Sequence, residues 1–208
     1  MLHRDINMNN IMWYKCGGEV VGVLCDFDTA EDDSIDGHME SRYRTGTAAP
    51  DPYMAIDLLA TDPPPPHKYR HDLESFFYLY VCAAATFDPD SEQKIRVVPQ
   101  WEHPSPRAAG LLKKQFLRSK AEYHAVLKHA PAKFQPAVQG VLRALWLLFV
   151  KVEYLAHQAS MAAILSEDTG KSPEVVQREL DGFEHQRDEL ASYANFMEIL
   201  GVPSEHEL

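Results

Sequence analysis

Cysteine is scarce in this 208-residue chain, and basic side chains are fewer than acidic ones. Cys16, Cys25 and Cys82 form no paired framework, and two of them lie in expected strands, where a buried thiol is ordinary. This usage fits a reducing compartment and predicts a cytoplasmic or nuclear protein. The 20 Lys and Arg against 31 Asp and Glu give a net charge of -11, which opposes general binding to nucleic acid or anionic lipid. The expected partners are therefore proteins.

Long uncharged hydrophobic runs are also lacking. The most apolar stretch, residues 141–155, contains Arg143, Lys151 and Glu153 and is too short to span a bilayer. We interpret it as a core helix and expect no membrane association. No charged and then apolar segment precedes the first motif, so no secretory signal is expected in this sequence.

The composition, with 45% hydrophobic and 10% aromatic residues, is typical of a globular protein, and one domain with a helical tail is the simplest interpretation. From Asp72 to Ala85 the apolar residues surround the axis, which predicts a helix buried on most sides. Residues 89–106 are interpreted as a polar connection, and helices are predicted near residues 107–129, 134–166 and 173–200. The last of these is expected to present one apolar face, made of Val176, Leu180, Phe183, Leu190, Tyr193 and Met197.

Two short motifs near the start of the chain point to chemistry. Leu2-His3-Arg4-Asp5 is followed by Asn10, and Asp26-Phe27-Asp28 comes sixteen residues later. A two-residue turn at Gly17-Gly18 would join strands over residues 11–14 and 20–25, pairing Cys16 with Glu19 and Asn10 with Cys25. This hairpin would place Asn10 beside Asp26. An amide oxygen and a carboxylate are hard ligands that suit Mg2+, and the nearby Asp5 could accept a proton.

These motifs resemble those of protein kinases, in which H-R-D, four residues, Asn and then D-F-G occur in this order. The chain departs from the pattern at Asp28, where the family usually has Gly. Residues 44–47 (R-T-G-T), 54–57 (M-A-I-D) and 71–76 (H-D-L-E-S-F) resemble the fungal-type protein kinase family in particular. The resemblance covers residues 1–87, and residues 88–208 show helical character alone.

The resemblance implies an α+β, mainly α-helical fold, the C-terminal lobe of a protein-kinase-like structure with a small β-hairpin at the catalytic loop. It divides the chain into residues 1–87, with the motifs and the central helix, and residues 88–208, the helical remainder with a C-terminal extension. It also implies ATP and Mg2+ as cofactors and a protein substrate phosphorylated on Ser or Thr. The resemblance leaves open whether Ser and Thr are preferred over Tyr as acceptors. It also leaves open the activating signal and the oligomeric state.

The resemblance also implies roles for individual residues. The catalytic group would be Asp5, accompanied by Arg4 and His3, and the Mg2+ and nucleotide ligands would be Asn10 and Asp26. Activation-segment roles would go to Thr45 and Thr47, for phosphorylation or for hydrogen bonding near Asp5. Structural roles would go to Asp57, where most members have the Glu of A-P-E, and to Asp72, which either caps its helix or bonds the catalytic-loop backbone, or does both.

The sequence contains no glycine-rich loop, strand lysine or helix glutamate of the kind that clamps the nucleotide in kinases. We therefore expect a lobe truncated before the catalytic loop, either naturally or through the gene model, and nearly inactive as an isolated chain. A non-catalytic pseudokinase or interaction scaffold is the alternative. A small-molecule phosphotransferase shares the three acidic and amide positions, but Arg4 and residues 44–57 argue against it.

Overall fold

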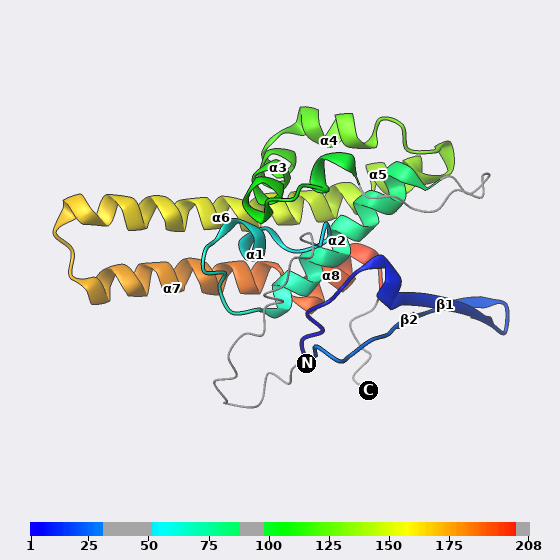
Figure 1. Cartoon of the computed structure of the whole chain (residues 1–208), viewed down its shortest axis with the longest axis horizontal. Helices are drawn as coiled ribbons and strands as arrows, with labels where there is room; N and C mark the ends of the chain where they lie inside the picture. Colours follow the sequence, from blue (N-terminus) through cyan, green and yellow to red (C-terminus); the bar gives the residue numbers. More distant parts are fainter. Residues whose placement is uncertain (31–50, 88–97, 203–208) are drawn as a thin grey trace. The chain divides into compact units, whose positions relative to one another are not determined.

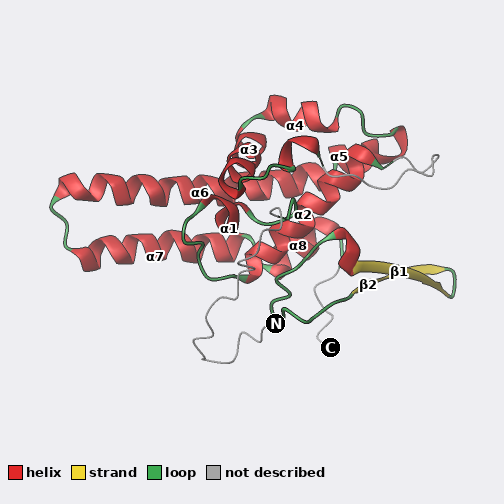
Figure 2. Cartoon of the chain, in the orientation of Figure 1, coloured by secondary structure: helices red, strands yellow, loops and turns green. Residues whose placement is uncertain are grey.

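The computed structural model describes residues 1–30, 51–87 and 98–202. Two compact units are present, Met1–Gln135 and Pro136–Leu208. Apart from one two-stranded ribbon, the regular elements of the described residues are helices (Figure 2). The prediction of a mainly helical α+β chain is thus confirmed. The division at residues 87 and 88 was drawn from motifs and stays a prediction.

The ribbon consists of β1 (Ile11–Cys16) and β2 (Glu19–Leu24) and follows the short 3-10 helix η1 (Met8–Asn10). Its register pairs Cys16 with Glu19, as predicted from the turn. Gly17 and Gly18 have φ values of 60° and 91°, which side-chain-bearing residues rarely adopt. β1 ends two residues later than predicted, and β2 begins and ends one residue earlier than predicted. The predicted register is confirmed.

The first unit is built around α2 (Tyr69–Thr86), which follows α1 (Ile56–Ala60). Phe77, Tyr78 and Val81 of α2 are completely buried, in agreement with a helix covered on most sides. The helix begins three residues before the predicted start, with Lys68 at the cap position. The expected capping role of Asp72 is therefore wrong, because Asp72 lies inside the first turn and its carboxylate is directed elsewhere.

The remaining helices of this unit are shorter than predicted. In place of one helix over 107–129 there are α3 (Pro106–Arg118) and α4 (Lys120–Leu127), separated at Ser119, whose hydroxyl accepts a hydrogen bond from the Glu122 amide at 3.2 Å. Gly110 lets α3 approach α1 closely, because a Cβ there would lie 3.1 Å from Cβ of Ala60. A serine cap stabilises a new helix start more than it stabilises continuation of the old one.

The connection before α3 contains a core residue that the sequence analysis treated as part of a polar loop. Trp101, in the 3-10 helix η2 (Pro99–Trp101), is completely buried. Its ring centroid lies 5.0 Å from that of Tyr78 and 5.3 Å from that of Phe116. A second 3-10 helix, η3 (Ala132–Phe134), follows α4. The polar interpretation is wrong at Trp101, because a single aromatic anchor leaves no periodic pattern.

The second unit is a helical hairpin with a short third helix. After α5 (Gln135–Gln139), which begins at the last residue of the first unit, α6 (Val141–Thr169) and α7 (Pro173–Leu190) run side by side, and α8 (Tyr193–Leu200) follows (Figure 1). The sequence predicts two helices here, near residues 134–166 and 173–200, whereas the structure has the four helices α5 to α8. Tyr193 is exposed while Phe196 is buried, so the expected single apolar face is wrong at Tyr193. The cause is the break before α8, where the Ser192 hydroxyl accepts from the Asn195 amide at 3.3 Å.

Across the described ranges, every helix is too short or too polar to cross a lipid bilayer.

Candidate active site

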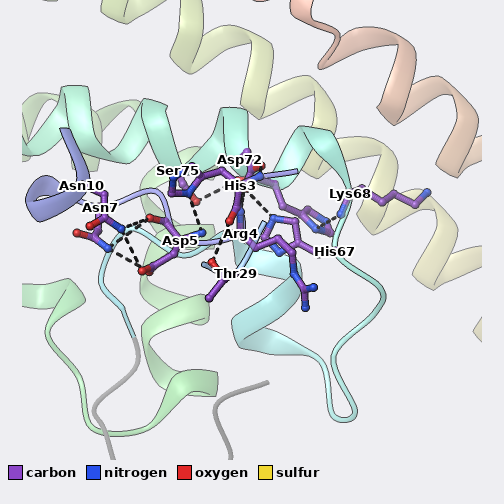
Figure 3. A network of polar contacts seen from close by, with 11 residues as sticks. His3, Arg4, Asp5, Asn7, Asn10, Thr29, His67, Lys68, Asp72 and Ser75 are labelled. Carbon is purple, nitrogen blue, oxygen red and sulfur yellow. Dashed lines mark hydrogen bonds and ion pairs between the residues drawn. The ribbon is translucent and has the colours of Figure 1, made fainter. Parts of the chain in front are cut away.

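The first motif is anchored to the central helix by one buried carboxylate. Asp72 of α2 accepts hydrogen bonds from the backbone amides of His3, at 2.7 Å, and Arg4, at 3.1 Å (Figure 3). Arg4 has a φ of 71°, a left-handed conformation that costs roughly 1 kcal/mol or more for a residue with a side chain. The two hydrogen bonds hold the loop in this conformation. Bonds from this aspartate to the backbone of the first motif are what the resemblance implies for Asp72, and its role in catalysis stays a prediction.

Asp72 has a third partner that the sequence analysis missed. Nε2 of His67 donates to Oδ1 of Asp72 at 2.9 Å, and both side chains are largely buried. Burial by itself would raise the pKa of Asp72, but the His67 contact and the two backbone amides outweigh it and lower the pKa below its ordinary value. The carboxylate therefore stays ionised and serves as an acceptor for all three donors.

Two asparagine amides orient the carboxylate of Asp5. Asn7 Nδ2 donates to Asp5 Oδ1 at 3.0 Å, and Asn10 Nδ2 donates to Asp5 Oδ2 at 3.1 Å and to the Asp5 carbonyl at 2.9 Å (Figure 3). Each carboxylate oxygen keeps a second lone pair that can receive a proton. Because Asn10 uses its amide nitrogen on Asp5, its Oδ1 is the atom suited to binding a cation.

The ribbon connects this loop to the second motif. The Cys25 amide donates to the Asn10 carbonyl at 2.8 Å, which extends the ladder by the pair predicted from the hairpin. Nε2 of His3 lies 2.9 Å from the Cys25 carbonyl, and Nδ1 of His3 accepts from the Asp5 amide at 3.3 Å. Both contacts are satisfied when Nε2 of His3 donates to the Cys25 carbonyl. Backbone bonds thus bring the start of the second motif next to Asn10.

Asp26 follows directly and has a φ of 63°. Among the described residues, Arg4 and Asp26 are the positions other than glycine with positive φ. Such conformations concentrate at functional sites, where the surrounding contacts maintain them. The Phe27 ring packs edge-on against His3 with centroids 4.8 Å apart, and the Thr29 hydroxyl donates to the His3 carbonyl at 3.0 Å. The two motifs are therefore in direct contact.

Asp57 takes part in a separate buried ion pair. Its Oδ2 lies 3.2 Å from Nη2 of Arg70 and 3.4 Å from Nε2 of His71. Nδ1 of His71 accepts from the Lys68 amide at 3.1 Å, and burial lowers the pKa of His71, against the opposing effect of Asp57. A neutral His71 ring accepts from the Lys68 amide through Nδ1 and donates to Asp57 through Nε2, so it satisfies both of these partners. Asp57, in the first turn of α1, consequently attaches α1 to the start of α2.

A second buried network holds the same segment and was missed in the sequence analysis. Nζ of Lys113 donates to the Met54 carbonyl at 2.6 Å and lies 3.9 Å from the centroid of the Tyr78 ring. Oε1 of Glu74 accepts from the Ile56 amide at 3.1 Å and from the Tyr78 hydroxyl at 3.0 Å. Glu74 of α2 and Lys113 of α3 thus both form hydrogen bonds to the backbone of residues 54–56.

Burial shifts the pKa of both charged groups toward neutrality. Burial, supplemented by the charge of Asp57, raises the pKa of Glu74, and burial lowers the pKa of Lys113. A signal for Lys113 existed in the sequence, since it occupies the apolar face of α3 between Ala109 and Phe116, both buried. A lysine at such a position is worth testing as a paired core residue.

The geometry of the motifs can now be compared with known proteins. Residues 1–83 match the family model described as fungal protein kinase. This part of the chain is similar to fungal protein kinases. The match includes both motifs, the ribbon and most of α2, and it confirms the resemblance inferred from the sequence. Comparison with curated proteins found no match, and comparison with solved structures found none either.

The kinase-type metal site requires few protein ligands. No group of three or more His, Cys, Asp or Glu side chains suited to a metal ion occurs in the described residues. Mg2+ in phosphotransferases is held by one or two protein oxygens together with water and phosphate oxygens, and the amide oxygen of Asn10 and the carboxylate of Asp26 are oxygen donors of this kind. Asn10 is buried and oriented by Asp5, whereas Asp26 is exposed at the end of the ribbon. The residues present fit the group that the family implies.

Thr45 and Thr47 lie outside the described residues, as does most of the segment from Asp28 to Pro52. Their assignment to the activation segment stays a prediction.

Proposed function

We propose that this chain is part of a protein kinase that, in the complete protein, transfers a phosphoryl group from ATP to Ser or Thr hydroxyl groups of a protein substrate. One observation carries the proposal: hydrogen bonds link Asp5 to Asn10 and Asn10 to Cys25, the residue that directly precedes Asp26 in the chain. The similarity of residues 1–83 to fungal protein kinases supports a phosphotransferase at the level of the family. The site residues named from the sequence are part of this proposal.

The proposed roles follow from the contacts. Asp5, held by the amides of Asn7 and Asn10, accepts the hydroxyl proton of the substrate. Asn10 and Asp26 would hold Mg2+, and the metal would supply neutralisation of the phosphate charge when ATP is bound. Asp72 keeps His3 and Arg4 in the conformation that positions Asp5. Lys113 and Glu74 hold the segment at residues 54–56, which lies at the substrate-docking end of the activation segment by resemblance to the family.

Residues 1–208 contain no glycine-rich phosphate loop and no strand lysine of the kinase kind. Because phosphoryl transfer depends mainly on positioning and electrostatic stabilisation, we expect this chain alone to bind ATP weakly and to transfer phosphate very slowly. Calorimetric titration of the purified chain with ATP and Mg2+ measures this directly. Micromolar affinity would overturn the expectation.

The metal ligands can be tested with Mn2+ in place of Mg2+, because bound Mn2+ changes the relaxation of solvent protons. We expect Asp26→Asn to weaken Mn2+ binding to the chain by about tenfold or more, which corresponds to about 1.4 kcal/mol. Loss of a carboxylate ligand is the reason. Asp28→Asn is the matched control, since Asp28 is an exposed acid two residues further along and should leave the affinity unchanged.

Equal Mn2+ binding by the parent chain and Asp26→Asn would reject Asp26 as a ligand, and so would an equal loss in Asp28→Asn. Circular dichroism of the three proteins would show whether they are equally folded.

An interaction module without catalysis is the second candidate, and the ribbon favours it. Met12, Trp13 and Tyr14 of β1 are more than half exposed, although they are large apolar residues. Exposed groups of this kind mark binding surfaces. The upstream reading frame distinguishes the candidates: a glycine-rich loop and lysine encoded there support the kinase, whereas a stop codon supports the scaffold.

Protein substrates and an intracellular, cytoplasmic or nuclear location complete the proposal. The location rests on the free thiols of Cys16, Cys25 and Cys82, and the protein partners rest on the net charge of -11 and on the family.

A further inference from the structure

An exposed apolar stripe runs along α6 in the second unit. Leu147, Tyr154 and Met161 recur every seven residues and are 44%, 59% and 41% exposed, and Leu165 continues the line at 53%. Seven residues make about two helical turns, so these side chains lie on one side of the helix. In α7, which packs beside α6, Val175 is the large apolar side chain exposed to a similar degree. The stripe therefore distinguishes α6 from the ordinary amphipathic helix next to it.

The opposite side of α6 is already used for packing. Leu145, Phe149 and Val152 are buried, and their positions alternate with those of the stripe around the helix. The stripe is therefore a second apolar face on a helix that already has one. Gln158 Nε2 donates to the Tyr154 hydroxyl at 3.0 Å along this face, which restricts the tyrosine side chain before any partner binds.

The charged side chains beside the stripe are basic at its first end and acidic at its last end. Arg143 and Lys151 lie four residues before and after Leu147, so they flank its first part. Asp168 lies seven residues after Met161 and flanks its last part. All three side chains are exposed. Two copies of this face placed antiparallel bring basic ends against acidic ends, whereas a parallel arrangement brings like charges together.

We propose that two copies of the chain associate through this stripe as an antiparallel, two-fold symmetric pair of α6 helices. With the symmetry axis level with Ala156, Leu147 of one copy faces Leu165 of the other. In the same register Arg143 lies near Asp168 of the second copy, and the aliphatic stem of Lys151 covers Met161 of the second copy. A single register therefore satisfies both the apolar and the charged residues, as an isologous interface requires.

The stripe extends over about 27 Å, taking the eighteen residue-to-residue steps from Leu147 to Leu165 at 1.5 Å each. This is short for a stable interface, so we expect a reversible dimer that forms at micromolar concentrations. Sedimentation velocity of the full chain over a concentration series measures the dissociation constant.

Leu165→Glu is expected to weaken dimerisation by about tenfold or more, because it places a charge against Leu147 of the second copy. Val175→Glu is the matched control: it changes an equally apolar and exposed residue of the same unit outside the stripe, and the dimer should persist. Circular dichroism should show the same helicity for both variants.

Charge reversal tests the antiparallel direction. Arg143→Glu alone and Asp168→Arg alone should each weaken the dimer severalfold at low salt, and the double variant should restore it. A parent chain that stays monomeric, a dimer that survives Leu165→Glu, or a double variant weaker than both single variants would overturn the proposal.

Discussion

Lys113→Met is expected to lower the free energy of unfolding by about 3 to 5 kcal/mol, the range found when one partner of a buried charged pair is removed. The substitution keeps the apolar stem but takes away the donor that bonds the Met54 carbonyl at 2.6 Å. It also leaves Glu74 in the core without the nearby positive charge that opposes the rise in its pKa. Urea unfolding followed by circular dichroism measures the loss.

The pairing itself is tested by a double-mutant cycle with Glu74→Gln. Glutamine keeps an acceptor for the Ile56 amide but removes the charge, so Lys113→Met should cost less in its presence, by about 1 kcal/mol or more. Lys120→Met, at an exposed lysine of the same unit, is the control and should change stability by no more than about 0.5 kcal/mol. Additive effects of the two buried substitutions would show that Lys113 and Glu74 act independently.

Asp72→Asn is expected to lower the free energy of unfolding by about 2 to 3 kcal/mol. The carboxylate accepts from three donors, the amides of His3 and Arg4 and Nε2 of His67. An asparagine side chain has one acceptor oxygen and turns its NH2 group toward another donor, which leaves a buried N–H unsatisfied. The left-handed conformation of Arg4 then loses its support, so hydrogen exchange at residues 3–5 should increase more than elsewhere.

The effect of Asp72 should depend on pH in a defined direction. Because the folded protein lowers the pKa of Asp72, the unfolded chain binds the proton more readily, and the stabilisation is complete above the ordinary range for an aspartate. It is lost as the pH falls through the folded-state pKa. The difference in stability between the parent chain and Asp72→Asn should therefore narrow in acid.

Asp28→Asn serves again as the control, because it replaces an exposed aspartate and should change the free energy of unfolding by no more than about 0.5 kcal/mol. A difference between the parent chain and Asp72→Asn that stays constant down to strongly acidic pH would contradict the assignment of the charge to Asp72.

Much of the candidate site could be predicted because its geometry is local. A two-residue turn determines the register of the strands on either side, so the pairing of Asn10 with Cys25 follows from counting residues along the chain. The helical character of the long periodic segments could also be predicted from the sequence. Helix ends could not, because the serine caps at Ser119 and Ser192 compete with continuation of the helix by small free-energy differences.

The two motifs, the ribbon that joins them and their similarity to fungal protein kinases could all be read from the amino-acid sequence, since they depend on spacing along the backbone. The folding of the chain in three dimensions is what brings distant groups together: Asp72 with the backbone amides of His3 and Arg4, and Lys113 with a carbonyl 59 residues earlier. These contacts depend on how the first motif packs against α2 and how α3 packs beside α1, and packing brings together groups whose separation in the sequence carries no periodic signal. Charged groups tolerate such burial only when packing supplies partners, and a linear sequence does not specify those partners.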